Sequence, residues 1–264
     1  MDYIRSNKEA WEEAFDNRAE SWCADIVGKL GSEGIPYLDK ALLDALLEFE
    51  TEGKRIAQFC CNNGRELLSA MKLGFHDGTG FDIAENQVAF ANAIAEETGI
   101  DCSFVATDIL DIGSEYHGSF DVIIITIGAL CWFRDLDPFF LKASRCLKPG
   151  GSLFVNEMHP VCNMLAASGE DNYNADMPNA LVNDYFGKTW TENKGIGYIA
   201  GKPYESKTFT SFSHSFSKIF NALSKSGLRP KSLEEYDYDI ADGMFTRLEN
   251  AGIPLSYVLS AGKS

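Results

Sequence analysis

The spacing of apolar and polar residues changes repeatedly between residues 37 and 160. Short apolar runs, which are typical of buried strands, alternate with segments whose apolar residues recur every three or four positions, as in an amphipathic helix. Gly74 and Gly99 follow two of the helical segments, and glycine often ends a helix. The pattern predicts strands over 56–60, 78–82, 102–106, 120–126 and 153–156, helices over 38–49, 65–73, 85–98 and 138–147, and a sharp turn over 149–151.

Strands that alternate with helices at this density indicate an α/β fold in which helices cover both faces of a parallel sheet. The run Val-Ile-Ile-Ile at 122–125 contains no polar position, which favours a strand that is buried on both faces. In sheets of this kind, ligands bind beyond the carboxyl ends of the strands. We therefore expect the functional residues directly after each predicted strand.

The flanking segments are less regular, but we interpret residues 1–264 as a single domain. Residues 1–36 are predicted as a helical cap over the ligand end of the sheet, and 37–160 as the ligand-binding core. Residues 161–204 are polar and lack a clear period, so they are interpreted as an insertion or lid, with a disordered spacer as the alternative. Residues 205–264 contain a predicted strand at 208–214 and a helix at 216–223, and they are expected to complete the sheet.

Composition and charge narrow the classes of function. The chain has 264 residues and a net charge of −16 at pH 7. Such a charge repels phosphate backbones and disfavours a nucleic-acid partner, although solubility alone also explains it. The longest apolar run is too short to span a bilayer, and the N-terminus has no signal-peptide core. We therefore expect a soluble, cytoplasmic protein without a membrane partner.

The seven cysteines are irregularly spaced and form no Cys-x-x-Cys pair. The sequence therefore predicts neither a zinc site nor a disulfide framework, and no metal is expected. Most of the cysteines are expected to be buried thiols in a reducing compartment. A disulfide between the adjacent Cys60 and Cys61 would be strained and is not expected.

The segment between the first predicted strand and its helix reads Cys-Cys-Asn-Asn-Gly at 60–64. It contains neither G-x-G-x-x-G nor G-x-x-x-x-G-K-[ST], which disfavours a dinucleotide-dependent oxidoreductase and a P-loop enzyme. Asn tolerates a left-handed backbone better than most other residues, so Asn62 or Asn63 can hold a turn of that kind. Asn carbonyls also suit a cationic ligand better than a pyrophosphate.

Two aspartates follow predicted strands. Asp82 follows the second strand, where a carboxylate can accept hydrogen bonds from both hydroxyls of a ribose, or can cap the next helix. Asp108 follows the third strand, where it can accept the exocyclic amine of adenine, or can form a turn. Ile83 and Ile109 stand next to them and can contact the two faces of the ring. The joint pattern favours a nucleoside cofactor.

This combination resembles the class I S-adenosylmethionine-dependent methyltransferases. The resemblance covers roughly residues 50–160 and includes "TIGALCWF" at 126–133, "LKPGGSLF" at 147–154 and "EMHP" at 157–160. It is closest to small-molecule methyltransferases of type 11/12, and it implies a Rossmann-like, mostly parallel, seven-stranded sheet. That family usually has an acid near position 58 and glycines at 60, 62 and 64. Here Gln58, Cys60 and Asn62 replace three of them, and only Gly64 remains.

The resemblance implies S-adenosylmethionine as cofactor and S-adenosylhomocysteine as product. The loop from Phe59 to Gly64 would surround the methionine part and the ribose, whereas Asp82 would bind the ribose hydroxyls and Asp108 the adenine amine. The expected cofactor-binding residues are Phe59, Cys60, Cys61, Asn62, Gly64, Asp82, Ile83, Asp108, Ile109, Ile127 and Gly128.

Methyl transfer from a sulfonium is an in-line displacement, which requires alignment of the reacting atoms and exclusion of water. A base is needed only when the acceptor carries a proton at neutral pH, and His159, His214 and Glu157 are the catalytic candidates. Each has a structural alternative. His159 can shape a turn, His214 can be a capping or core residue, and Glu157 can pair with a neighbouring amide.

We expect an enzyme that methylates a small, partly apolar organic acceptor. The acceptor would lie between the N-terminal helices, the ends of the fourth and fifth strands, and residues 161–204. A monomer or homodimer is expected, with no nucleic-acid partner. The alternatives are a non-catalytic module that binds S-adenosylmethionine or another nucleoside and regulates a partner, and an oxidoreductase on a Rossmann fold.

Overall fold

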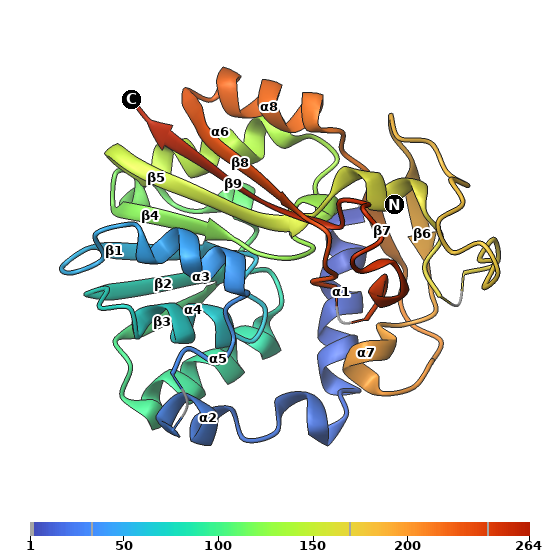
Figure 1. Cartoon of the computed structure of the whole chain (residues 1–264). Coiled ribbons are helices and arrows are strands. Elements are labelled where there is room, and N and C mark those ends of the chain that lie inside the picture. Colours follow the sequence, from blue (N-terminus) through green and yellow to red (C-terminus); the bar gives the residue numbers. More distant parts are fainter. Residues whose placement is uncertain (1–2, 33, 169, 242) are drawn as a thin grey trace.

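Seven strands form one twisted sheet in the order β3-β2-β1-β4-β5-β9-β8 (Figure 1). The structure is a computed structural model and describes residues 3–32, 34–168, 170–241 and 243–264. Neighbouring strands from β3 to β5 are parallel, whereas β9 is antiparallel to both β5 and β8. The predicted mostly parallel α/β sheet is therefore confirmed. The strands are β1 (Arg55–Phe59), β2 (Asp77–Asp82), β3 (Cys102–Ala106), β4 (Phe120–Ile125), β5 (Leu147–Met158), β8 (Leu228–Tyr236) and β9 (Ser256–Lys263).

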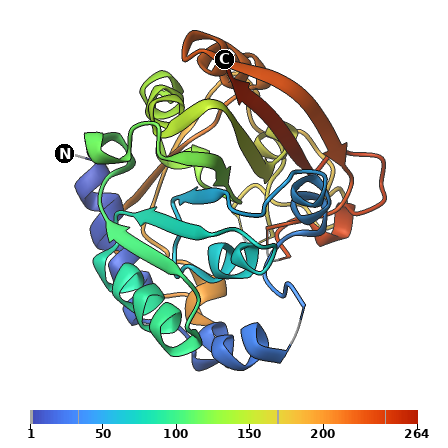
Figure 2. The ribbon, with the colours of Figure 1, turned by 90° about the vertical axis from the view of Figure 1, so that its left-hand side faces the viewer.

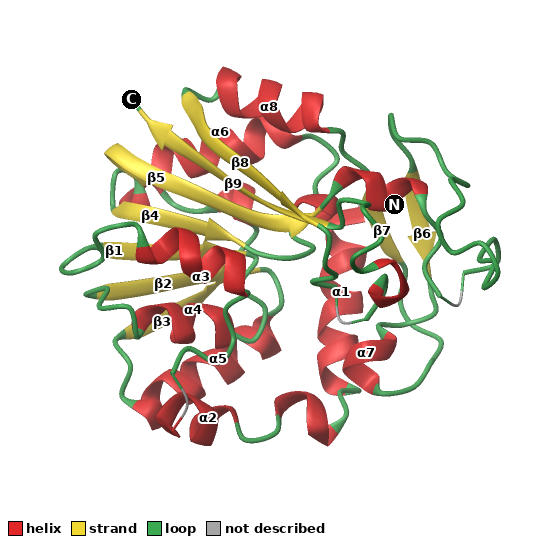
Figure 3. Ribbon diagram, viewed as in Figure 1, coloured by secondary structure: helices red, strands yellow, loops and turns green. Residues whose placement is uncertain are grey.

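Helices cover both faces of this sheet, as predicted (Figures 1 and 3). One core joins the sheet to α6 and α8, through residues such as Phe139 and Leu223, and a second joins it to α2, α3, α4 and α5, through residues such as Leu42 and Leu67. Figure 2 shows α8 and α2 at opposite ends of the molecule. The helices are α1 (Tyr3–Asp16), α2 (Ile26–Ser32), α3 (Lys40–Leu47), α4 (Arg65–Met71), α5 (Glu85–Thr98), α6 (Leu136–Cys146), α7 (Gly197–Ala200) and α8 (Phe216–Lys225).

The predicted turn at 149–151 is wrong, because these residues belong to β5. The strand begins at Leu147, which pairs with Phe120, and the next pair is Ser152 with Val122. The extra residues are accommodated by a register shift, and Gly150 takes a φ of +81° within it. A Pro-Gly-Gly segment therefore forms an irregularity inside one long strand, which its composition alone does not distinguish from a turn.

A second sheet contains two antiparallel strands, β6 (Thr189–Glu192) and β7 (Phe209–Phe212). The strand predicted at 208–214 therefore exists, but it lies outside the main sheet. Helix α1 packs on β7, where the Asn7 side chain donates to the Thr210 carbonyl (2.8 Å) and accepts from its N–H (2.7 Å). Figure 1 shows α1 crossing beyond the carboxyl ends of β1 to β4, next to β7 and α7.

Several short 3-10 turns complete the described chain: η1 (Glu20–Cys23), η2 (Ile109–Asp111), η3 (Ser114–Tyr116), η4 (Leu130–Trp132), η5 (Pro160–Met164) and η6 (Thr246–Leu248). Of the predicted N-terminal cap and insertion, residues 1–2, 33 and 169 lie outside the described residues. No helix in the described ranges has the length and apolar character needed to cross a membrane.

Candidate functional site

A cavity of about 360 Å³ lies at the carboxyl ends of the parallel strands and is covered by α1. This volume is within the range of pockets that bind small molecules. The wall combines residues that directly follow β1 to β4 with residues from α1 and α4 and from two later parts of the chain, one before α7 and one between β8 and β9. The lining residues are Tyr3, Ile4, Asn7, Trp11, Trp22, Cys60, Asn62, Asn63, Arg65, Glu66, Asp82, Ile83, Gln87, Asp108, Ile109, Thr126, Ile127, Gly128, Ala129, Cys131, Trp132, Phe133, Met158, Ile196, Tyr198, Ile240, Ala241 and Met244.

The loop after β1 has a left-handed backbone at three alternate positions. The φ angles are +57° at Cys60, +51° at Asn62 and +77° at Gly64. As predicted, Asn62 holds such a turn, and Cys60 does so as well. A Cβ atom on Gly64 would lie 2.6 Å from the Phe104 ring and 2.8 Å from Ala91, so only glycine fits there. The loop therefore keeps a glycine-like conformation at positions 60 and 62, although neither residue is a glycine.

Asp82 joins this loop to the end of β2. Its Oδ2 accepts a hydrogen bond from the N–H of Asn62 (2.8 Å), and its Oδ1 accepts one from the N–H of Ala84 (3.0 Å). Burial raises the pKa of Asp82, and the N–H groups of Ala84 and Asn62 partly oppose that rise. A carboxylate has further lone pairs on both oxygens, so Asp82 can hold the loop and still accept from a ligand.

Asp108, Ile83 and Ile109 also reach the cavity. Asp108 follows β3 and its Oδ1 accepts from the N–H of Leu110 (2.9 Å), so it caps the short turn η2 as well as lining the pocket. The turn-forming interpretation of Asp108 is therefore confirmed, whereas its contact with adenine stays a prediction. Asp82 and Asp108 are on neighbouring parallel strands, which places both carboxyl groups at the same edge of the sheet.

The carboxyl group of Glu157 fixes the loop after β4 by accepting two backbone hydrogen bonds. Its Oε2 accepts from the N–H of Gly128 (2.8 Å), and its Oε1 accepts from the N–H of Leu130 (2.9 Å). Glu157 is 5% exposed, and burial raises its pKa from 4.5 to about 7 against the opposing effect of these amides. Gly128 has a φ of +80°, and its Cβ position faces open space. Glu157 thus shapes the cavity wall without lining the cavity.

The two candidate histidines are also outside the lining residues. His159 accepts from the N–H of Val161 through Nδ1 (3.1 Å), and its Nε2 lies 2.7 Å from Glu235 Oε1. His214 places Nε2 2.9 Å from the carbonyl of Phe133. Burial lowers the pKa of both imidazoles. His159 thus caps the turn η5, and His214 makes a buried contact, in agreement with the structural alternatives of a turn-shaping His159 and a capping or core His214.

The cavity brings together eight of the predicted cofactor-binding residues: Cys60, Asn62, Asp82, Ile83, Asp108, Ile109, Ile127 and Gly128. Phe59, Cys61 and Gly64 do not line it. Phe59 packs edge-on against Phe81 in the core (5.8 Å between ring centroids), and Cys61 is also buried. Gly64 acts through the backbone turn that starts α4.

Comparison with known proteins agrees with this geometry. The family described as "Methyltransferase domain" matches residues 56–151. The predicted resemblance is confirmed for this segment, and S-adenosylmethionine is the cofactor of the class I enzymes that share the fold.

Individual curated relatives match this chain over less than half of its length. A ribosomal RNA large subunit methyltransferase I of Aeromonas hydrophila is 30% identical over 122 residues, which cover 40% of this chain and 30% of the relative. A ubiquinone biosynthesis O-methyltransferase of Xanthomonas euvesicatoria is 27% identical over 124 residues, covering 46% of this chain and 51% of the relative. The matched part thus spans a third to a half of these curated relatives.

A solved structure shows the same fold over more of the chain. An S-adenosylmethionine-dependent methyltransferase of Mesorhizobium loti superposes with a TM-score of 0.65 at 19% identity, covering 87% of this chain and 100% of that protein. At this identity the superposition shows the fold alone.

The sequence did not single out several parts of this cavity. Ile4 and Asn7 lie on one face of α1, and their helical spacing is the one signal that indicates a shared surface. Ile240, Ala241 and Met244 carry no such signal. The connection between β8 and β9 brings them to the pocket, and their position depends on the tertiary structure. Of the described residues between 161 and 204, Ile196 and Tyr198 line the cavity.

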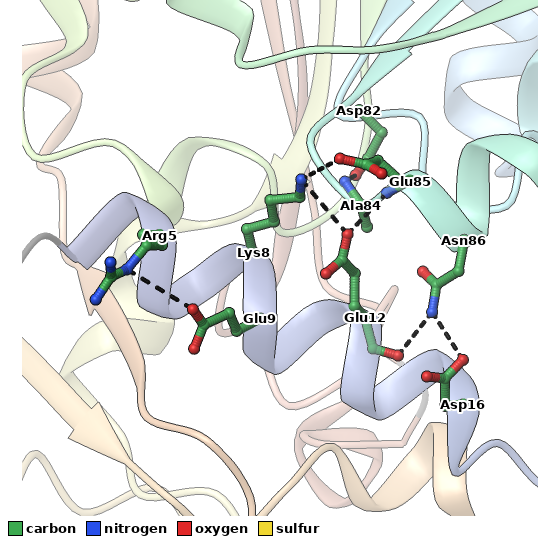
Figure 4. A network of polar contacts seen from close by, with 9 residues as sticks. All are labelled: Arg5, Lys8, Glu9, Glu12, Asp16, Asp82, Ala84, Glu85 and Asn86. Atoms are coloured by element: carbon green, nitrogen blue, oxygen red, sulfur yellow. Dashed lines mark hydrogen bonds and ion pairs between the residues drawn. The ribbon is translucent and has the colours of Figure 1, made fainter.

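Helix α1 is fastened beside Asp82 by a polar network (Figure 4). Asn86 donates through Nδ2 to the Glu12 carbonyl (2.8 Å) and to Asp16 Oδ1 (2.9 Å). Glu12 Oε1 accepts from the N–H of Glu85 (3.2 Å), and Lys8 pairs with both Glu85 and Glu12. The start of α5, which follows the Asp82 corner, therefore anchors the helix that covers the cavity.

The cysteines of the described residues are all free thiols. Cys60 and Cys61 therefore form no vicinal disulfide. Burial is the first cause that raises the pKa values of both thiols well above the usual range, and the Asp82 carboxylate is the second. The cavity thus presents a neutral thiol at Cys60.

The residues present fit the cofactor of this class. The lining contains three carboxyl groups, Glu66, Asp82 and Asp108, and one guanidinium, Arg65. S-adenosylmethionine carries a sulfonium, an ammonium and one carboxylate, so its charges complement this set. Two buried polar atoms in the wall, Trp22 Nε1 and Gln87 Oε1, have no hydrogen-bond partner among the described residues. A ligand with both donors and acceptors would satisfy them.

Proposed function

We propose that this chain is an S-adenosylmethionine-dependent methyltransferase that methylates a small, partly apolar organic acceptor. One observation supports this most strongly. The same cavity combines acidic residues that follow β1 to β3 with an apolar wall. This wall is formed by residues of α1 and the loop after β4 together with Ile196, Tyr198, Ile240 and Met244. The acidic wall suits a cationic nucleoside, and the apolar wall suits the acceptor.

The acidic wall supports the cofactor part of the proposal. Asp82 lines the cavity and would accept from the ribose hydroxyls. Asp108, which lines the cavity together with Ile83 and Ile109, would accept from the adenine amine. A pyrophosphate would meet three carboxyl groups and a single guanidinium here. This charge balance disfavours a dinucleotide cofactor.

The apolar wall supports the acceptor part. Trp11 and Trp132 meet edge-to-face, with ring centroids 5.4 Å apart, and Phe209 packs on both. These rings form a rigid boundary that can hold an aromatic or aliphatic group. The apolar residues assigned to this wall are Tyr3, Ile4, Trp11, Trp132, Phe133, Met158, Ile196, Tyr198, Ile240 and Met244.

The chain's chemical contribution would be alignment and exclusion of water. When bound, the cofactor supplies a methyl group that is already activated by a positive sulfur. Apart from the three carboxyl groups assigned to the cofactor, no described residue that lines the cavity is an aspartate, glutamate or histidine. The acceptor atom would therefore attack with a free lone pair or as an anion, without a proton transfer to a side-chain base.

A small acceptor is favoured over RNA, although one relative is named as a ribosomal RNA methyltransferase. RNA binding requires cationic side chains that neutralise phosphates. The chain has a net charge of −16, and the cavity wall offers a single arginine.

The test is a turnover assay with S-adenosylmethionine labelled in the methyl group. The purified chain would be mixed with a library of small phenols, amines, thiols and carboxylic acids, and separately with ribosomal RNA. We expect a labelled small-molecule product, and Asp82→Asn is expected to reduce its formation, whereas the exposed Asp101→Asn should not. Label in the RNA would refute the acceptor class. Cofactor binding without any product would instead favour a regulatory binding module.

A further inference from the structure

Gln58 does not line the cavity. It occupies the position where the family that this sequence resembles usually has an acid. Its side chain is fully buried in β1 and is absent from the lining. Its Nε2 donates to Glu66 Oε2 (2.8 Å) and to Thr126 Oγ1 (2.8 Å). Thr126 Oγ1 in turn donates to the same Glu66 oxygen (2.9 Å). The side-chain amide of Gln58 in β1 therefore orients the carboxylate of Glu66 in α4.

Glu66 itself lines the cavity, and the described residues leave its second oxygen, Oε1, without a hydrogen-bond donor. A glutamate at position 58 would place two carboxylates within hydrogen-bond distance of each other, which is unfavourable. An amide at 58 and a carboxylate at 66 are thus a matched pair. The negative charge is therefore carried by Glu66 at the cavity wall, eight residues after position 58.

Arg65 precedes Glu66 and also lines the cavity. Its guanidinium lies 5.5 Å from the Trp22 ring and 5.7 Å from the Tyr37 ring, and it forms no ion pair among the described residues. Successive residues in a helix point about 100° apart, so the two charges do not face each other. The buried Trp22 Nε1, beside Arg65, lacks an acceptor.

We propose that Arg65 and Glu66 recognise the amino-acid end of the cofactor. Glu66, held by Gln58 and Thr126, accepts from the α-ammonium group. Arg65 and Trp22 Nε1 donate to the α-carboxylate. This inference rests on the proposed function, because it assigns residues to one part of the same cofactor.

The test measures binding by calorimetry with edited ligands, and it needs no turnover. The ligands are S-adenosylhomocysteine, its deaminated and decarboxylated forms, and 5′-methylthioadenosine, which lacks the whole amino-acid end. We expect the wild-type chain to bind S-adenosylhomocysteine roughly tenfold to hundredfold more tightly than the deaminated form. Glu66→Gln should lower the affinity for S-adenosylhomocysteine by a similar factor. Its affinities for the deaminated form and for 5′-methylthioadenosine should equal those of wild type.

Arg65→Met tests the other half of the assignment. This variant should have a lower affinity for S-adenosylhomocysteine but an unchanged affinity for the decarboxylated form. Asp101→Asn, at an exposed residue, is the control and should alter none of the affinities. Equal wild-type affinity for S-adenosylhomocysteine and the deaminated form would overturn the inference, even if a variant failed to fold. So would a Glu66→Gln variant that loses affinity for every ligand alike. Failure of wild type to bind any of the four would instead refute the proposed function.

Discussion

The carboxylate of Glu157 accepts a 2.8 Å hydrogen bond from the backbone N–H of Gly128, at the point where the loop after β4 enters the cavity wall. The second oxygen holds Leu130 in the same way. A fully buried ionisable group therefore fixes the conformation of a loop that lines the ligand site. Glu157 therefore acts as a positioning residue for this loop. Because its pKa is raised to about 7, its contribution to stability depends on pH.

The first prediction concerns stability against pH. Burial raises the pKa of Glu157 from 4.5 to about 7, so between these values the folded state binds more protons than the unfolded state. The free energy of unfolding contributed by this group therefore falls as pH rises through that window. A difference of one in pKa between the folded and unfolded states corresponds to ~1.36 kcal/mol, so the total effect is roughly 3 kcal/mol.

Glu157→Gln isolates this effect, because the amide does not titrate. Urea unfolding at pH 5 to 8 should show that the stability of wild type relative to Glu157→Gln decreases as pH rises to about 7. The decrease should level off only well above that pH, where the group is ionised in both the folded and the unfolded state. A difference that is independent of pH would mean that the carboxyl group is ionised throughout this range.

The second prediction concerns the left-handed loop. A positive φ costs a non-glycine residue roughly 1–2 kcal/mol, so Cys60→Gly relieves strain while it loses about 0.5–1 kcal/mol to the greater freedom of the unfolded chain. The net change in the free energy of unfolding should be within about 1 kcal/mol of zero. The adjacent Cys61 is 1% exposed and has no positive φ, so Cys61→Gly should destabilise by about 2 kcal/mol or more. Unfolding in urea under reducing conditions compares the two, and equal losses would contradict the loop conformation.

The third prediction concerns the helix over the cavity. Asn86→Ala removes two hydrogen bonds that join α5 to α1, each worth about 0.5–1.5 kcal/mol. Amide hydrogen exchange in α1 should therefore accelerate by roughly fivefold or more. Arg5→Ala is the control, since the Arg5–Glu9 pair lies within α1 and is exposed. Exchange that is equally fast in both variants would show that these contacts do not hold α1.

Much of the core was predictable because its signals are local. Helix α5 has the predicted bounds, Glu85–Thr98, since Gly99 follows it with a left-handed backbone. Strand β4 was recognisable from four consecutive apolar residues. The strand ends then placed Asp82 and Asp108 at one edge, because parallel strands share their carboxyl edge.

The catalytic candidates show that side-chain direction could not be predicted from the sequence. A residue after a strand lies near the cavity, but the sequence does not say which way its side chain points. His159 turns to Glu235, and Glu157 turns under the loop to Gly128. Glu66 was overlooked for the opposite reason: its significance depends on Gln58, which contacts it only in three dimensions.

The most direct test of the central claim is calorimetric titration of the wild-type chain and of Asp82→Asn with S-adenosylhomocysteine. Asp82→Asn removes charge-assisted hydrogen bonds to the ribose worth ~1.5–3 kcal/mol. We predict saturable one-site binding to wild type, with affinity roughly tenfold to hundredfold lower in Asp82→Asn. Absence of binding to wild type at high micromolar ligand would contradict the account, and equal affinities would contradict its placement of the ribose.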